Sequence, residues 1–286
     1  MGKLKYTFKN DTLFKMLFVK HPDLLERLVA ALLGIRPESI GKFTVTNSEM
    51  PPAAMKEKFC RLDINMIVDG QQVNLEIQVG DKGNYPERPL YYWARMFSSA
   101  LGESGEYHAL PHTIAISIVD FKFLDCAEYH SEFRLFETAR RAPLTDKMSL
   151  HFFELPKLPE NIGTDSELLL WLSLFKAETE KALSQIEALR IPIMTQAIKA
   201  YRHITVTDEF KELERLRERA RHDEASALGH ARREGERKAN EKWQGVVAEK
   251  DTVIAQKDVA IANSEAQNAE LKAYIAELEK QIKNGE

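Results

Sequence analysis

The stretch FCRLDINMIVDGQQVNLEIQVG, residues 59–80, decides how the first half of the chain folds. Two segments in which apolar and polar residues alternate flank Asp69-Gly70. An Asp-Gly pair between such segments is a strong hairpin signal, because both positions of the tight turn need positive φ angles. With these two residues as the loop, Val68 faces Gln71. The sequence therefore predicts two antiparallel strands in a defined register.

The predicted hairpin has one apolar and one polar face, since the side chains of a strand alternate. The apolar face comprises Leu62, Ile64, Met66, Val68, Val73, Leu75, Ile77 and Val79. The polar face comprises the facing pairs Asp63 and Glu76, Arg61 and Gln78, and Asn65 and Asn74. A four-residue turn would move Asp63 opposite Gln78 but keep it on the face of Glu76, whereas a three-residue turn would separate the two carboxylates.

Two carboxylates in facing positions make the polar face unusual. Like charges directly opposite each other destabilise a strand pair, by about 3 kcal/mol at a separation of about 5 Å and an effective dielectric of about 20. Water relieves this repulsion in an antiparallel sheet with one solvated face. A divalent cation also relieves it, and the face offers the carboxylate and amide oxygens that Mg²⁺ prefers. The residues allow both interpretations, a solvated sheet and a cation site.

An Asp on one strand and Glu-x-Gln on the next resemble the PD-(D/E)XK nuclease superfamily, and most closely its Rpn group of recombination-promoting nucleases and transposases. Asp63, Glu76 and Gln78 occupy the motif positions. The resemblance spans about residues 6–158. Six segments carry it in order: NDTLFK (10–15, followed by Phe18), RLDI (61–64), EIQ (76–78), RPLYYW (88–93), YHALP (107–111) and ELPK (154–157).

The resemblance implies a restriction-endonuclease-like core of the α/β class, a mixed sheet flanked by helices, over residues 1–160. The apolar patterns agree with the superfamily order of helix, three strands, helix and strand. They predict helices at 11–33 (interrupted at His21-Pro22) and 88–101, and strands at 43–47, 113–121 and 150–155 besides the hairpin. The aromatic stripe of the second helix is more typical of a core than of a stacking platform: Tyr91, Tyr92, Trp93 and Phe97.

The resemblance also implies a chemistry for the polar face. Asp63 and Glu76 would hold Mg²⁺ or another divalent cation, with the backbone carbonyl of Ile77 as a further ligand. Such an ion activates water and neutralises charge on a phosphate. Gln78 stands where the superfamily usually has lysine, and its amide positions water but carries no charge. Because the Rpn pattern also has Gln there, this departure does not predict inactivity, but it leaves the general base unassigned.

Four further residues are secondary candidates for the site. Asp11 either caps the first helix or lies near the metal, as the resemblance implies. Lys15 and Arg88 either contact a phosphate or make ordinary surface interactions. Lys157 would supply the positive charge that Gln78 lacks, if the two side chains lie close together.

The second half of the chain reads as a helical extension. Two helices are predicted around Ile191-Pro192 within residues 161–206. Residues 207–286 mix both charge signs, as solvated helices do, and contain two basic segments (215–221 and 232–238) able to contact a DNA backbone. The positions spaced by seven are Val247, Ile254, Ile261, Asn268, Ile275 and Ile282. This pattern predicts a coiled coil over residues 246–282 that forms a parallel homodimer; the alternative is a single amphipathic helix lying on the core.

Composition limits where the protein acts. Two cysteines, Cys60 and Cys126, make no disulfide framework, which suits a reducing cytoplasm. The N-terminal residues are basic and polar, and no apolar run approaches the roughly 18 residues that span a bilayer. We therefore expect a cytoplasmic protein without membrane partners. The net charge of −4 does not favour a nucleic-acid binder, although a nuclease site built from carboxylates tolerates it.

These observations predict a metal-dependent DNA endonuclease that dimerises through its tail and promotes recombination or DNA mobility. The alternative is a DNA-binding or assembly protein on a nuclease fold with weak or no catalysis, whose function lies in the coiled coil. Strand transfer by a true transposase ranks lower, because the sequence shows no separate domain for recognising transposon ends.

Overall fold

The computed structural model describes residues 2–46, 64–80, 83, 85, 87–101, 105–160 and 163–283. Arg61, Leu62 and Asp63 therefore lie outside the described residues. Contacts between Cα atoms divide the chain into two compact units, Met1–Ala220 and Arg221–Glu286. Among the helices of the described segments, none is long and apolar enough to cross a membrane.

The chain begins with two helices, α1 (Asp11–Lys20) and α2 (Pro22–Leu33). The cap of α1 is Asn10, whose side-chain oxygen accepts a hydrogen bond from the backbone N–H of Leu13 at 2.9 Å. Proline is favoured in the first turn of a helix because that position needs no N–H donor, so α2 starts at Pro22. The predicted interruption at His21-Pro22 is confirmed, and Asp11 is the first helical residue rather than the cap.

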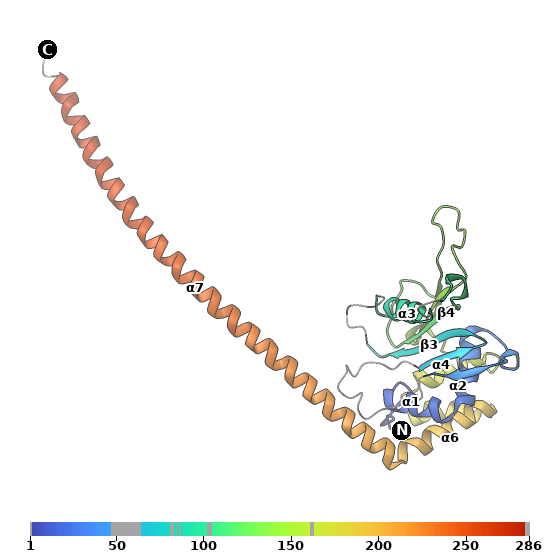
Figure 1. Ribbon diagram of the computed structural model, residues 1–286. Coiled ribbons are helices and arrows are strands. Elements are labelled where there is room, and N and C mark those ends of the chain that lie inside the picture. Colours follow the sequence, from blue (N-terminus) through green and yellow to red (C-terminus); the bar gives the residue numbers. More distant parts are fainter. Residues whose placement is uncertain are drawn as a thin grey trace. The chain divides into compact units, whose positions relative to one another are not determined.

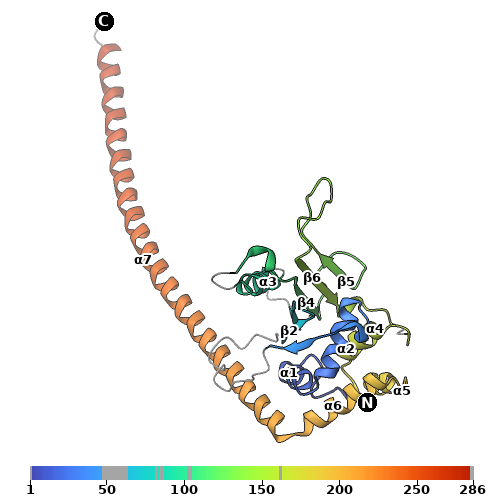
Figure 2. The same cartoon turned by 45° about the vertical axis from the view of Figure 1, so that its right-hand side comes forward.

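A six-stranded mixed sheet forms the centre of the first unit, as the α/β prediction requires (Figures 1 and 2). Its order is β1-β2-β3-β4-β6-β5. The strands are β1 (Phe43–Val45), β2 (Ile64–Val68), β3 (Gln71–Gln78), β4 (Thr113–Val119), β5 (His130–Phe133) and β6 (Met148–Glu154). Strands β3, β4 and β6 are parallel, and the other pairs are antiparallel. The edge strand β5 was not predicted.

The hairpin register predicted from Asp69-Gly70 is confirmed. Val68 pairs with Gln71, and Asn65 pairs with Asn74. Both turn residues have positive φ, 48° at Asp69 and 81° at Gly70. The Asp69 carboxylate also accepts hydrogen bonds from the backbone N–H groups of residues 41 and 42, which tie the turn to the segment before β1.

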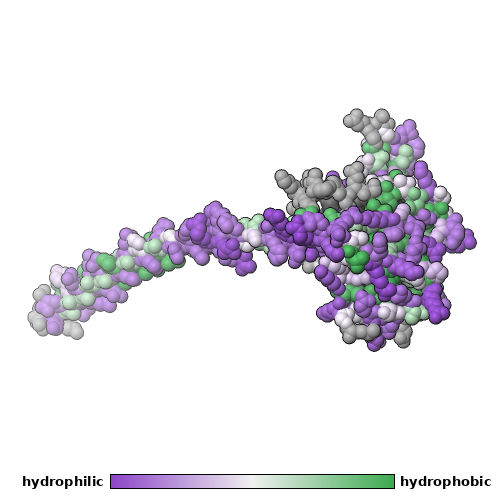
Figure 3. Space-filling view, turned by 90° about the horizontal axis from the view of Figure 1, so that it is seen from below, coloured by the Kyte–Doolittle hydropathy of each residue, from purple (hydrophilic) through white to green (hydrophobic). Residues whose placement is uncertain are grey.

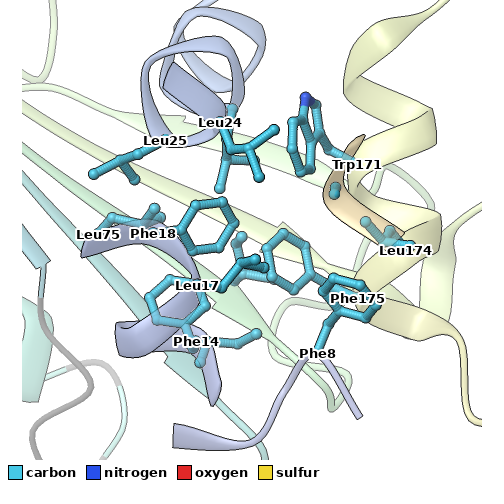
Figure 4. Close-up of a cluster of buried hydrophobic side chains, with 14 of the residues drawn as sticks. Phe8, Phe14, Leu17, Phe18, Leu24, Leu25, Leu75, Trp171, Leu174 and Phe175 are labelled. Carbon is cyan, nitrogen blue, oxygen red and sulfur yellow. The ribbon is translucent and has the colours of Figure 1, made fainter. Parts of the chain in front are cut away.

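One face of the sheet packs against α1, α2 and a group of later helices. These are α4 (Glu167–Lys176), α5 (Glu180–Ala188) and α6 (Pro192–Val206). Phe18 and Leu75 meet Trp171 and Phe175 in the layer between sheet and helices (Figure 4). Three helices stand where two were predicted, because the side chain of Thr179 caps a separate α5. Val79, expected on this face, is exposed because β3 ends at Gln78.

The opposite face of the sheet packs against α3 (Glu87–Ser99). A smaller apolar cluster lies there, formed by Tyr85, Ala115, Val119, Met148, Leu150 and Phe152. Trp93 packs against this cluster and donates a hydrogen bond from Nε1 to the carbonyl of Thr113 at 2.8 Å. Tyr91 is exposed, so the prediction that the whole aromatic stripe is core is wrong for this residue.

The remaining elements are short 3₁₀ helices and one long α-helix. The 3₁₀ helices are Pro37–Ser39, Tyr107–Ala109 and Leu155–Lys157. Helix α7 runs from Asp208 to Lys283, and its first turns belong to the first unit, where Phe210 is fully buried. In the second unit, apolar side chains lie exposed among charged ones (Figure 3).

Candidate active site

Glu76 lies on β3 in the interior of the sheet. Its side chain points to the face that α3 covers, together with those of Asn74 and Gln78, since these residues alternate with Leu75 and Ile77 of the apolar core. Glu76 is 1% exposed, and Asn74 and Gln78 are also buried. The polar face of β3 is therefore not a solvated surface.

Arg88, in the first turn of α3, supplies positive charge to this face. Its Nη2 lies 2.5 Å from Oε1 of Glu76, and its Nη1 donates a hydrogen bond to Oε1 of Gln78 at 3.1 Å. The guanidinium also lies over the ring of Tyr92, 5.7 Å from the centroid. A buried carboxylate is costly unless a paired charge compensates for the loss of its hydration. The structure thus brings together three of the residues singled out in the sequence: Glu76, Gln78 and Arg88.

The amide of Gln78 is held in one orientation. Its Nε2 donates to the carbonyl of Gly80 at 2.7 Å, which directs Oε1 towards Arg88. The backbone carbonyl of Gln78 accepts from the N–H of Asp120 at 2.9 Å, so the end of β3 is joined to the end of β4. Ile77 points its side chain into the apolar core, and only its backbone is available to the polar face.

The donor set on the polar face suits a hard cation. Asn74 lies two residues before Glu76 on β3 and pairs with Asn65 of β2. The side chain of Asn74 donates a hydrogen bond to Oδ1 of Asn65 at 2.7 Å. Carboxylate and amide oxygens are the ligands that Mg²⁺ and Ca²⁺ prefer. Within the described residues no group of three or more His, Cys, Asp or Glu side chains is arranged to hold a metal. Asp63, the second predicted carboxylate, is not among those residues.

Asp11 and Lys15 lie on α1. Asp11 forms an ion pair with Arg217 of α7, and the neighbouring Asn10 donates to Glu214 at 2.8 Å. Lys15 lies one helical turn further on and is half-buried. These contacts join the start of α7 to α1, a role that the sequence did not indicate.

Lys157 is bound to Glu154 and not to Gln78. Its Nζ donates to Oε1 of Glu154 and to the carbonyl of Leu124, both at 2.7 Å. Glu154 is 1% exposed and accepts a further hydrogen bond from the backbone N–H of Phe123 at 2.6 Å. Since β4 separates β6 from β3, the structure places Lys157 with Glu154 instead of beside Gln78.

A further charge cluster, centred on the buried side chain of Lys9, was missed by sequence reasoning. Nζ of Lys9 contacts Oδ2 of Asp120 at 2.5 Å and Oε1 of Glu178 at 2.9 Å. Burial lowers the pKa of Lys9, but the hydrogen bonds and charges of the two carboxylates outweigh it, so the pKa is raised overall. The one local signal in the sequence was Asp120, which directly follows the buried strand β4. Lys9 and Glu178 lie far from Asp120 in the sequence, so no local pattern connects the three residues.

Comparison with known proteins identifies a family for this chain. The family model described as PD-(D/E)XK nuclease family transposase matches residues 8–231. That range includes the whole sheet, α1 to α6, and the cluster of Glu76, Gln78 and Arg88. No curated protein and no solved structure gives a significant match.

Proposed function

The chain belongs to the PD-(D/E)XK nuclease family transposases, and from this premise we propose that it hydrolyses phosphodiester bonds in DNA with Mg²⁺ as its metal ion. Nucleases of this superfamily generally use divalent metal ions. The observation that carries the proposal is the buried carboxylate of Glu76, held on an interior strand beside Gln78 and Arg88. Cutting of DNA by such a site would promote recombination.

Each residue of the proposed site has a distinct task. Glu76 and Asp63 would hold the ion, with the backbone carbonyl of Ile77 as a third ligand. Bound there, Mg²⁺ would activate a water molecule and neutralise charge on the phosphate. Gln78 would orient that water through its fixed amide. Arg88 would bind the phosphate oxygens, because its planar guanidinium offers paired donors.

Asp11, Lys15 and Lys157 are assigned supporting roles in this proposal. Asp11 is engaged by Arg217 and Lys157 by Glu154, so both stabilise the junctions at which they lie. Lys15 is the one of the three that we assign to phosphate contact, since it lies on the same helix as Asp11 and is half-buried.

Cleavage of supercoiled plasmid by the full-length protein tests the proposed function. We expect nicking with Mg²⁺ or Mn²⁺ and none with EDTA. Glu76→Gln and Asp63→Asn should each lower the rate by about three orders of magnitude, the loss expected when a metal no longer stabilises the transition state. Glu154→Gln is the matched control, because Glu154 is equally buried and also paired with a cation.

Circular dichroism must show that each variant is folded, and the control should still cut DNA. Cleavage by Glu76→Gln at the wild-type rate would refute the proposed site. Metal-independent DNA binding by a folded wild-type protein that never cuts would favour the DNA-binding and assembly alternative.

Self-association through α7 is the second part of the proposal. The apolar a positions with described side chains are each more than half exposed, for example Ile254 at 55% and Ile261 at 56%. Exposed β-branched residues spaced by seven are the pattern that pairs with a second copy, and Asn268 among these a positions specifies register. We therefore propose a parallel homodimer formed by residues 246–282.

Sedimentation velocity measures this association directly. The wild-type chain should sediment as a dimer, and the double variant Ile254→Glu, Ile261→Glu as a monomer. Thr252→Glu, which adds a charge outside the seam, should remain dimeric. A monomeric wild type at micromolar concentration would contradict the proposed dimer.

A further inference from the structure

The contact between Arg88 and Glu76 lies where the proposed function places a metal ion. Glu76 is 1% exposed and the side chain of Arg88 is 15% exposed, and 2.5 Å separates Nη2 of Arg88 from Oε1 of Glu76. A buried carboxylate without a counter-charge would destabilise the fold. Arg88 therefore neutralises the carboxylate that a divalent cation would also neutralise.

The guanidinium of Arg88 and a metal ion bound to Glu76 would repel each other. A guanidinium in contact with the carboxylate would be within a few ångströms of any ion bound to the same group, and like charges at that distance repel strongly in a poorly solvated site. Binding of the ion must then weaken the ion pair between Arg88 and Glu76. By linkage, Arg88 must weaken the binding of the ion to the same extent.

Arg88 has other contacts that it can keep when it leaves Glu76. Its guanidinium lies over Tyr92, one helical turn further along α3, and such stacking suits a planar cation. The side chain of Arg88 is 15% exposed and that of Glu76 is 1% exposed, so of the two partners Arg88 is the one that solvent reaches. A phosphate that approaches from solvent would meet Arg88 first.

We propose that Arg88 pairs with Glu76 before a metal ion binds and turns to the DNA phosphate afterwards. This inference rests on the proposed function and adds a coupling between the two ligands. Arg88 competes with the cation for Glu76, and its release makes the guanidinium available to DNA. Metal and DNA should therefore bind cooperatively through this one side chain.

Mn²⁺ binding to the full-length protein, measured by isothermal titration calorimetry without DNA, tests the competition. Arg88→Gln should bind Mn²⁺ roughly tenfold more tightly than wild type, within the usual range of couplings between sites. Arg88→Lys keeps the charge and should return the affinity towards the wild-type value. Arg95→Gln is the matched control, since Arg95 lies on α3, is exposed and stacks on Tyr91 at 5.9 Å.

Thermal unfolding gives a second readout that does not depend on activity. In EDTA, Arg88→Gln should melt at a lower temperature than wild type, because Glu76 loses the charge of Arg88, and Mn²⁺ should raise its melting temperature more than that of wild type. If Arg88→Gln does not fold in EDTA, recovery of a cooperative melt with Mn²⁺ supports the exchange, and failure to recover overturns it.

DNA binding in Ca²⁺ completes the test. With wild type, Ca²⁺ should increase affinity for a short duplex, and Arg88→Gln should lose that increase while Arg95→Gln keeps it. If wild type binds Mn²⁺ and Arg88→Gln binds it no more tightly, the competition by Arg88 is overturned but the metal site is not. Absence of Mn²⁺ binding by wild type would overturn the metal site itself.

Discussion

The two faces of the central sheet both carry buried apolar side chains, but the face towards α3 also buries charged ones. The face towards α1, α2 and α4 is closed by apolar side chains, with Phe18 against Phe14 at 5.0 Å between ring centroids. The face towards α3 buries charge, including the carboxylates of Glu76 and Glu154. Because the side chains of β3 alternate, this one strand contributes residues to both faces, and substitutions can address each face separately.

The charged face itself contains two different kinds of buried acid. Glu154 is held by Lys157 and by backbone N–H groups of the segment after β4, which is a fixed structural arrangement. Glu76 is paired with the first turn of α3, in the segment RPLYYW that resembles the nuclease family. Burial of a carboxylate alone does not mark a catalytic group, and its partner has to be considered.

Substitution on the apolar face should have the largest effect on stability. Phe18→Ala removes a fully buried ring that packs near Trp171, 6.1 Å between centroids, and should lower the free energy of unfolding by about 3–5 kcal/mol. Urea titration measures this loss. Leu90→Ala on α3 is the control, since Leu90 is 46% exposed and should change stability by about 0.5 kcal/mol or less. Equal losses in the two variants would contradict the contribution to stability that the burial of Phe18 indicates.

A second, smaller effect concerns a pair of histidines at the edge of the apolar face. Nε2 of His130 and Nδ1 of His151 are 3.2 Å apart, and burial lowers the pKa of His151 to about 4 despite the nearby Glu132. Because the folded state favours neutral imidazole, stability is full above the unfolded pKa of 6.5 and is lost as the pH falls towards 4. The loss from His151 should be about 3 kcal/mol.

Unfolding free energies of wild type and His151→Gln, measured from pH 7 to pH 4, isolate this contribution. The advantage of wild type over the variant should shrink across that range. His222→Gln, at an exposed position of α7, should follow the wild-type pH dependence. A constant difference between wild type and His151→Gln would show that His151 does not titrate in this window.

Local sequence predicted those parts of the fold that depend on neighbouring residues. The turn at Asp69-Gly70 set the register, and Pro22 set the break between α1 and α2. The strand HSEF was missed because it is short, pairs on one side only and lacks apolar alternation. Thr179 was missed as the cap of α5, because no Pro or Gly marks the boundary between α4 and α5.

The candidate site was predicted in part for the same reason. Glu76 and Gln78 follow from the hairpin, but the partner of Arg88 depends on how α3 packs on the sheet, which no local pattern contains. The condition set for Lys157, closeness to Gln78, could not be judged from the sequence, since it depends on the order of β3, β4 and β6. The role of Asp63 stays a prediction.

The smallest predicted effect concerns the turn that assigns residues to the two faces. Gly70 has a φ of 81°, and a Cβ added there would meet no atom within 4 Å, so Gly70→Ala carries only the conformational cost of about 1 kcal/mol. Gly235→Ala, in the helical α7, should be neutral or slightly stabilising. A slip of one residue would exchange the two faces of β2 and move its apolar side chains out of the core. Since this cost far exceeds that of the substitution, Gly70→Ala should retain both register and cleavage. Loss of cleavage without loss of stability in Gly70→Ala would mean that the turn acts on the site directly, and not only through the register.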